Sequence, residues 1–335
     1  MRAAVLDTFG EPLAVRDVPV PEPGAGEVLV RLETCGVCHT DIHTAHGDWA
    51  VAPELPLVPG HEGIGLVQGA GEGATVDVGT RVAIPWLGSA CGECELCRSG
   101  RENLCPGQRN TGYSRDGCFA EYVTADAAYV VEVPDGVDPV AAAPLTCAGL
   151  TTYAALRRAG TREGDRVAVF GIGGLGHLAV QYARLAGADV VAVDVVPEKL
   201  ELARELGAAE AVDAAGEDPV RALRKLGGAD RAIVVAATPV AAAQALASLR
   251  RGGTLVLVAL PQGVLELPIV PTVLKGITVT GSIVGTRAEL REVLDLHAAG
   301  RTRVITEERP LDAVNEAMAD VEAGRVPGRV VLRTG

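Results

Sequence analysis

The sequence predicts an α/β protein of two domains, one rich in β-strands and one built on a doubly wound parallel sheet. A chain of 335 residues is long for a single hydrophobic core. Its first 150 residues contain short strand-like runs punctuated by glycine and proline, whereas strand-like and helix-like segments alternate from about Gly149 onward. Such alternation is typical of a parallel sheet with helical crossovers.

The first part of the chain is expected to form a β-rich, partly barrel-like domain. Apolar and β-branched residues predict strands at residues 27–32, 63–68 and 81–85. Proline and glycine dominate residues 19–26, before the first of these strands, and Gly71, Gly73 and Gly79 are among the residues between the second and the third. These residues favour turns over continued strand.

The second part is expected to consist of βα units. The predicted strands span residues 166–170, 189–193, 231–235, 254–258 and 277–282, and the predicted helices span 175–185, 198–206, 219–226 and 240–249. After about residue 286, the pattern predicts helices at 288–300 and 311–323 and a last strand at 329–332.

Charge and composition exclude some functions. The formal net charge of −13 argues against nucleic-acid binding, which requires a basic face. No segment approaches the roughly 20 apolar residues of a membrane helix, and the N-terminus shows no secretory signal. Eight cysteines in such a chain favour metal binding or catalysis over disulfides. We therefore expect a cytoplasmic protein.

Four cysteines, Cys91, Cys94, Cys97 and Cys105, lie close together with the spacing C-x2-C-x2-C-x7-C. Four thiolates on a short loop can enclose one tetrahedral Zn²⁺, and a site filled by protein ligands has no position for substrate. We therefore expect a structural zinc. Two disulfides or an iron–sulfur cluster could use the same residues, although the ferredoxin run continues as C-x3-C-P.

A glycine motif, G-x-G-x-x-G, follows the predicted strand at 166–170. Its members are Gly171, Gly173, Gly174, Leu175 and Gly176. The glycines permit a tight turn, and the following helix N-terminus offers N–H groups to a pyrophosphate.

An acidic residue follows this motif at the spacing of a dinucleotide site. Asp194 ends the next strand, 18 residues after Gly176, where a carboxylate accepts hydrogen bonds from the adenosine ribose and repels a 2′-phosphate. The motif therefore predicts NAD as the cofactor, the alternative being an ordinary glycine turn. Lys199 is a candidate for the same ribose or a solvated lysine at the start of a helix.

Three further residues, Cys38, His61 and Cys147, have side chains that bind zinc, but no local spacing links them. Two cysteines and one histidine would leave a fourth position open, as in catalytic zinc sites. Taken singly, each of these residues can be interpreted as a buried thiol or a core histidine, and the residues alone do not show that the three meet.

Six short motifs carry a resemblance to a known family. They are GVCHTD at 36–41, HGDW at 46–49, PGHEG at 59–63, CAGLT at 147–151, GIGGLGH at 171–177 and GRVVL at 328–332. Together with the four-cysteine loop, they make the chain similar over essentially its whole length to the zinc-dependent medium-chain alcohol dehydrogenases, especially their yeast-type and bacterial branch. Cys118 stands where these relatives commonly have glycine.

The resemblance implies a discontinuous catalytic domain of GroES-like fold, residues 1–148 and 287–335, which carries the structural zinc loop 91–105. Residues 149–286 would form a Rossmann NAD-binding domain inserted into it. The active site would lie in the cleft between the domains.

The resemblance also implies roles for single residues. Cys38, His61 and Cys147 would be ligands of a catalytic zinc, Glu62 a carboxylate that approaches the metal, and Asp41 the partner that orients His61. Thr40 and His43 would relay the proton. His39 would lie near the pyrophosphate, Thr151 and Val284 near the nicotinamide end, and Arg329 at a phosphate. Val258 would be a further cofactor-binding residue. Trp49 and Trp86 would line the substrate pocket, unless they only pack in the core.

The implied activity is NAD-dependent oxidation of small primary alcohols, with secondary alcohols as a further option, and the reverse reduction. The implied cofactors are two zinc ions per chain and NAD, and the implied assembly is a homo-oligomer, often a tetramer. One alternative is a related zinc dehydrogenase for polyols, aromatic alcohols or a formaldehyde adduct. Another is a non-catalytic protein that binds NAD and zinc.

Overall fold

The computed structural model describes residues 1–335, and the chain divides into two compact units. Unit 1 comprises Met1–Leu150, Thr286–Gly300 and Val304–Gly335, and unit 2 comprises Thr151–Gly285 and Arg301–Arg303. Residues 301–303 belong to unit 2, and the Gln181 side chain of that unit binds both backbone groups of Arg303. Its Oε1 accepts from the N–H at 2.7 Å and its Nε2 donates to the carbonyl at 2.9 Å.

Unit 1 is built on a largely antiparallel sheet around one long strand, β3 (Glu27–Val37). The strand order is β16-β17-β3-β4-β5-β9, and β8 also pairs with β3. The other strands are β4 (Gly63–Ala70), β5 (Arg81–Ile84), β8 (Tyr122–Asp126), β9 (Val131–Glu132), β16 (Thr306–Pro310) and β17 (Arg329–Arg333). Only the pair β16–β17 is parallel. The tail therefore returns to the sheet, because β17 pairs with residues 34–37 of β3.

The residues of β3 alternate between buried and partly exposed positions along most of the strand. Val28, Val30 and Leu32 are fully buried and belong to the core of unit 1, which also contains Phe119 and Leu332. Each fully buried aliphatic side chain of this size contributes about 1.5–3 kcal/mol relative to an exposed one. This alternation with a period of two residues determines which face of β3 packs against the core.

The remaining elements of unit 1 are short strands and helices of up to 12 residues. They are β1 (Arg2–Val5), β2 (Ala14–Asp17), β6 (Leu87–Ser89), β7 (Arg109–Asn110), α1 (His39–His46), α2 (Glu95–Arg98), η1 (Glu102–Leu104), α3 (Pro139–Ala142), η2 (Ala143–Thr146), α10 (Arg287–Ala298), η3 (Leu311–Ala313) and α11 (Val314–Glu322). Helix α4 (Ala148–Arg158) crosses the boundary between the units.

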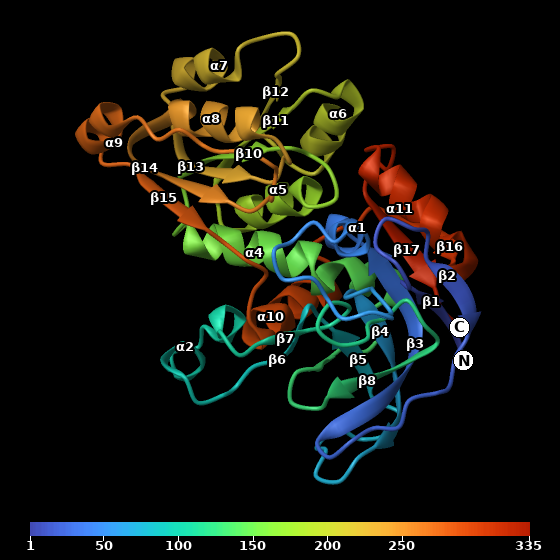
Figure 1. The fold of residues 1–335 in the computed structure, drawn as a ribbon. Coiled ribbons are helices and arrows are strands. Elements are labelled where there is room, and N and C mark those ends of the chain that lie inside the picture. Colours follow the sequence, from blue (N-terminus) through green and yellow to red (C-terminus); the bar gives the residue numbers. More distant parts are fainter. The chain divides into compact units, whose positions relative to one another are not determined.

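Unit 2 is a six-stranded, entirely parallel sheet with helices on both faces (Figure 1). The strands, in their spatial order, are β12 (Glu210–Asp213), β11 (Asp189–Asp194), β10 (Arg166–Phe170), β13 (Ala229–Val234), β14 (Leu249–Leu257) and β15 (Thr278–Gly281). The helices are α5 (Gly176–Leu185), α6 (Pro197–Glu205), α7 (Pro219–Lys225), α8 (Pro239–Ser248) and α9 (Ile269–Lys275). The strand order reverses between β10 and β13, as in doubly wound dinucleotide-binding sheets, and this confirms the predicted α/β fold class.

The helices of unit 2 begin where the sequence provides start signals. Helices α6, α7 and α8 each carry proline in the first turn, where no N–H partner is lost. Asp218 and Thr238 precede α7 and α8, and each accepts a hydrogen bond from a first-turn N–H group.

No helix of this structure is by itself both long enough and apolar enough to cross a membrane, although the bent pair Pro139–Thr146 and Ala148–Arg158 meets those two criteria when taken together.

Candidate active site

The first candidate ligand, Cys38, lies between β3 and α1. It is the N-cap residue of α1, and its backbone N–H donates to Asp41 Oδ2 at 2.8 Å. Gly47, in the left-handed conformation, ends the helix after two turns. The capping arrangement therefore fixes the Cys38 backbone and places Asp41 beside it.

His61 lies in the turn that leads into β4, and only 1% of its side chain is exposed. Its Nδ1 lies 2.9 Å from Asp41 Oδ1, which is equally buried. Burial alone would lower the pKa of His61, but the charge and the hydrogen bond of Asp41 raise it well above its ordinary value. The other ring nitrogen, Nε2, is buried and has no hydrogen-bond partner.

Cys147 follows η2 at the junction with α4, far from the other two in the sequence. The structure nevertheless brings Cys38, His61, Cys147 and Glu62 together, with their ligand atoms all within 4.8 Å of one another. The two sulfur atoms are 4.0 Å apart. The Cys147 thiol lowers the pKa of Cys38 well below its ordinary value, and Cys38 together with burial raises that of Cys147.

This cluster fits a zinc ion. Two sulfurs on tetrahedral zinc would lie about 3.8 Å apart, given Zn–S bonds of about 2.3 Å. An unpaired buried nitrogen such as His61 Nε2 costs about 1–3 kcal/mol, and a metal ion would remove that cost. Asp41 on Nδ1 is the usual outer partner of a metal-binding imidazole.

Glu62 and Arg329 form a buried ion pair beside this cluster, with 0% and 4% of their side chains exposed. Burial raises the pKa of Glu62 to about 7, against the opposing charge of Arg329. A Cβ atom at Gly36 would lie 2.0 Å from Glu62 Oε2, so only glycine at this position leaves room for the carboxylate. Glu62 Oε2 and Arg329 Nε have no hydrogen-bond partner.

The predicted relay residues lie on α1. His43 Nδ1 is 2.7 Å from Asp48 Oδ2, and 28% and 34% of these side chains are exposed. Sequence reasoning did not assign Asp48, although the HGDW motif contains it. His39, an exposed residue, begins the same helix, and Thr40 follows it.

Aromatic rings gather beside the metal cluster. Trp86 meets the ring of His61 edge-on at 5.3 Å, and Trp49 meets Trp86 edge-on at 6.0 Å. Tyr113, a further residue that the sequence did not single out, lies 5.0 Å from Trp49 and 5.7 Å from Trp86. Of the two predicted pocket residues, Trp86 thus adjoins the candidate ligand His61, and Trp49 packs against Trp86.

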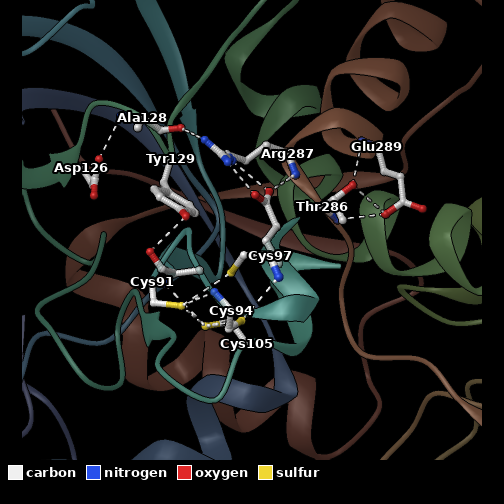
Figure 2. Close-up of polar contacts among 12 residues, drawn as sticks. Cys91, Cys94, Cys97, Cys105, Asp126, Ala128, Tyr129, Thr286, Arg287 and Glu289 are labelled. Atoms are coloured by element: carbon white, nitrogen blue, oxygen red, sulfur yellow. Dashed lines mark hydrogen bonds and ion pairs between the residues drawn. The ribbon is translucent and has the colours of Figure 1, made fainter. Parts of the chain in front are cut away.

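The four-cysteine loop forms a second cluster, in which the sulfur atoms of Cys91, Cys94, Cys97 and Cys105 face one another (Figure 2). Three sulfur–sulfur distances are 3.5–3.9 Å, close to those on tetrahedral zinc and far longer than a disulfide bond of about 2.05 Å. Backbone N–H groups of Cys94, Cys97 and Gly107 donate to sulfur at 3.3–3.4 Å, which stabilises thiolates.

The glycine motif of unit 2 lies between β10 and α5, as its pattern predicts. A Cβ atom at Gly176 would lie 1.9 Å from the Gly171 carbonyl oxygen, so the helix can approach the strand this closely only with glycine. Asp194 ends β11 and accepts hydrogen bonds from Ile172 N–H at 2.6 Å and from the next two backbone N–H groups. The carboxylate is therefore held against the glycine turn.

The other predicted cofactor residues of unit 2 lie after strands of the parallel sheet or on helices. Val258 directly follows β14, and Val284 lies three residues after β15. Both follow carboxyl ends of parallel strands, the edge at which doubly wound sheets bind ligands. Thr151 lies on α4 and Lys199 on α6. The predicted contacts of His39 and Arg329, which belong to unit 1, stay predictions.

Comparison with known proteins identifies the family. Residues 24–135 match the alcohol dehydrogenase GroES-like domain and residues 174–299 match the zinc-binding dehydrogenase domain. An alcohol dehydrogenase of Geobacillus stearothermophilus is 52% identical over 335 residues, with 99% of both chains covered. The chain belongs to the zinc-type medium-chain alcohol dehydrogenase family. This confirms the resemblance that the sequence motifs carry.

Solved structures of alcohol dehydrogenases have the same fold as this chain. The alcohol dehydrogenase of Aeropyrum pernix has a TM-score of 0.93 and 35% identity, with 99% of this chain and 100% of that chain covered. A structure described as an NAD-dependent alcohol dehydrogenase has a TM-score of 0.93 and 32% identity, with both chains fully covered. The protein is thus an alcohol dehydrogenase of the zinc-binding type, which interconverts alcohols and carbonyl compounds.

Proposed function

We propose that this enzyme oxidises small primary alcohols, and some secondary ones, with NAD as the hydride acceptor, and that it catalyses the reverse reduction. The observation that carries this proposal is the buried cluster of Cys38, His61 and Cys147, in which His61 Nε2 has no partner. Two zinc ions per chain are proposed, one in this cluster and one in the four-cysteine loop.

The residues around the cluster have distinct tasks in this proposal. Cys38, His61 and Cys147 would hold a zinc ion, which would supply Lewis-acid chemistry for loss of the alcohol proton, and NAD would serve as the hydride acceptor. Asp41 keeps His61 in the tautomer that leaves Nε2 available to the metal. Glu62 remains within reach of the ligands, held by its ion pair with Arg329.

The proton released from the alcohol has to leave the site. We infer that it passes from Thr40 to His43 and that Asp48 assists this step. Asp48 Oδ2 accepts from Nδ1–H of His43, so that Nε2 is free to take the proton, and the carboxylate stabilises the cation that forms.

An Asp48→Asn variant tests this role. We expect kcat to fall about tenfold, the size of one lost charge-assisted hydrogen bond, while NADH affinity is unchanged. Asp48→Glu should restore part of kcat. Glu322→Gln is the matched control, because Glu322 pairs with His46 of the same helix at 3.9 Å. Equal kcat in Asp48→Asn and wild type would remove Asp48 from the proton path.

The preference for NAD over NADP rests on Asp194. Its carboxylate lies at the end of β11 beside the glycine turn, where it can accept from ribose hydroxyls but repels a 2′-phosphate. The solved structure described as NAD-dependent supports the same cofactor.

An Asp194→Gly variant should lose this preference. We expect kcat/KM with NAD to fall about 10–100-fold, as for loss of hydrogen bonds to a charged group, and kcat/KM with NADP to rise. Asp213→Gly is a matched control, because Asp213 ends the neighbouring strand β12 and accepts from the Ala215 N–H at 2.9 Å. An unchanged NAD-to-NADP ratio in Asp194→Gly would exclude Asp194 from the ribose site.

The substrate class follows from the aromatic cluster. Trp86 packs against the His61 ring, Trp49 and Tyr113 pack against Trp86, and this aromatic cluster favours short alcohols over bulky ones. NADH formation should therefore be measured for ethanol, a branched secondary alcohol, an aromatic alcohol, a polyol and a formaldehyde–thiol adduct. The proposal predicts the highest kcat/KM for ethanol, and no NADH with any of them would contradict it.

A homo-oligomer is part of the proposal. Eight large exposed aliphatic residues gather between positions 260 and 283 of unit 2, including Val264 and Ile269, which are 83% and 77% exposed. The edge strand β15 in the same region pairs only with β14. A second copy of the chain would cover such a surface. Light scattering should give four times the 34.4 kDa chain mass, and a monomer would contradict this part.

A further inference from the structure

Tyr113 joins the two tryptophans of the aromatic cluster. Its ring lies 5.0 Å from that of Trp49 and 5.7 Å from that of Trp86. Trp86 in turn contacts the ring of His61, and Trp49 lies 5.9 Å from the ring of His43. Aromatic pairs at these separations attract one another beyond the effect of burial. The cluster therefore adjoins both a candidate zinc ligand and the proposed proton acceptor.

Trp49 lies on a segment with little backbone support of its own. Helix α1 ends at His46, and residues 49–56 contain no helix or strand and form no backbone–backbone hydrogen bonds. The carbonyl of Val51 instead accepts a hydrogen bond from the Tyr113 hydroxyl. A segment with few backbone hydrogen bonds opens easily unless side chains hold it. Tyr113 holds this one by a ring contact and by a hydrogen bond.

Tyr113 belongs to a strap, residues 111–119, that lies between β7 and β8. The N–H of the first strap residue donates to the Trp86 carbonyl at 2.9 Å. Arg115, two residues after Tyr113, donates from Nη2 at 2.8 Å to Glu27 Oε1 and at 2.8 Å to a main-chain carbonyl of β8. Because Glu27 begins β3, the strap is fixed to the central strand of unit 1.

The end of the strap is fixed to the turn before His61. The N–H groups of residues 117–119 donate to the carbonyls of residues 58–60 at 2.6–3.0 Å. A Cβ atom at Gly117 would lie 2.1 Å from the Gly60 carbonyl oxygen, so only glycine permits this close approach. The strap therefore holds Tyr113 at a fixed place relative to the candidate zinc ligand.

We propose that Tyr113 is a positioning residue that sets the width of the substrate pocket through Trp49. Because the strap is anchored to β3 and to the turn before His61, the ring and hydroxyl of Tyr113 hold the Trp49 segment against Trp86. The two tryptophans then limit the space beside the metal cluster to short alcohols. This inference rests on the proposed oxidation of small alcohols and assigns its selectivity for substrate size to Tyr113.

Two variants of Tyr113 test the proposal through substrate selectivity. Tyr113→Ala removes the ring and the hydroxyl, so the ratio of kcat/KM for benzyl alcohol to kcat/KM for ethanol should rise about tenfold. Tyr113→Phe keeps the ring and loses only the hydrogen bond to Val51, so the same ratio should rise about threefold. Both variants should retain the zinc content of the wild type.

The matched control is Tyr129→Phe. Tyr129 also donates from its hydroxyl to a carbonyl, that of Ala90 at 3.2 Å, but its ring packs against Arg287 rather than against a tryptophan. This control loses the same kind of hydrogen bond elsewhere in unit 1 and should keep the wild-type ratio.

Tryptophan fluorescence provides a readout that does not require turnover. Trp49 and Trp86 are the only tryptophans of the chain, so the emission reports on this cluster alone. In Tyr113→Ala the emission maximum should shift to longer wavelength, and acrylamide should quench the emission more strongly, because Trp49 becomes more exposed to water. Tyr113→Phe should show a smaller shift in the same direction, and Tyr129→Phe should show none.

An unchanged alcohol ratio in Tyr113→Ala would overturn the proposal. Equal losses of kcat/KM with ethanol and benzyl alcohol would overturn it too, because they indicate a general loss of structure rather than a wider pocket. Unchanged emission in both Tyr113 variants would contradict the tie between Tyr113 and Trp49. If the wild-type enzyme oxidises neither alcohol, the proposed function fails, and the emission of the variants still decides whether Tyr113 positions Trp49.

Discussion

In the His61→Ala variant we expect alcohol oxidation to fall by at least about 10³-fold, because the site loses a metal ligand and with it several kcal/mol of transition-state stabilisation. Cys38→Ala should have the same effect. Zinc content should fall from two to one per chain, and NADH affinity should change little, because the glycine motif and Asp194 belong to unit 2. Turnover, metal content and NADH fluorescence titration measure the three quantities separately.

The control for this prediction is His46→Ala. His46 lies on α1 with 44% of its side chain exposed and belongs to neither metal cluster. It should retain two zinc ions and full turnover. Normal turnover in His61→Ala or Cys38→Ala would refute the ligand assignment.

The second large effect is expected for Cys105→Ser in the four-cysteine loop. Cys105 is the buried member of the cluster, and its sulfur also accepts the Gly107 N–H. A structural zinc contributes its binding energy to folding, so we expect loss of one zinc and a melting temperature lower by about 5–15 °C. Below that temperature the variant should still oxidise alcohol.

Circular dichroism and metal analysis test this prediction, with Cys118→Ala as the control. Cys118 is a fully buried thiol outside both clusters, so its replacement should leave two zinc ions. An unchanged melting temperature together with two zinc ions in Cys105→Ser would contradict a structural zinc in the loop.

Features that depend on residues close in sequence could be predicted well. The spacing of Cys91, Cys94, Cys97 and Cys105 already places four sulfurs on one loop. The glycine motif and Asp194 follow directly from the βα pattern, in which a strand, a turn and a helix are consecutive. The alternation of strands and helices similarly indicates the parallel sheet of unit 2.

Features that depend on distant residues could not be derived from spacing. Cys38, His61 and Cys147 meet only because β3 and the turn before β4 are neighbours and η2 ends beside them. Family motifs, rather than any periodicity, suggested that grouping. The pair Glu102–Arg287 joins residues 185 positions apart and left no signal in the sequence.

Some elements escaped prediction for physical reasons. Strand β16 reads TEERP, which has no apolar alternation, and it forms because β17 supplies a parallel partner. Helix α9 contains Pro271 and no buried residue, so neither propensity nor periodicity marks it. Helix α1 was missed because its eight residues carry three histidines and a buried aspartate in place of an apolar stripe.

The most direct test of the account is an anomalous-difference map from crystals of the zinc-loaded protein, recorded at the zinc absorption edge. The account predicts a peak about 2.0–2.3 Å from His61 Nε2 and from the sulfurs of Cys38 and Cys147, in addition to the peak in the four-cysteine loop. A filled four-cysteine loop with no zinc at His61 would contradict the proposed catalytic centre.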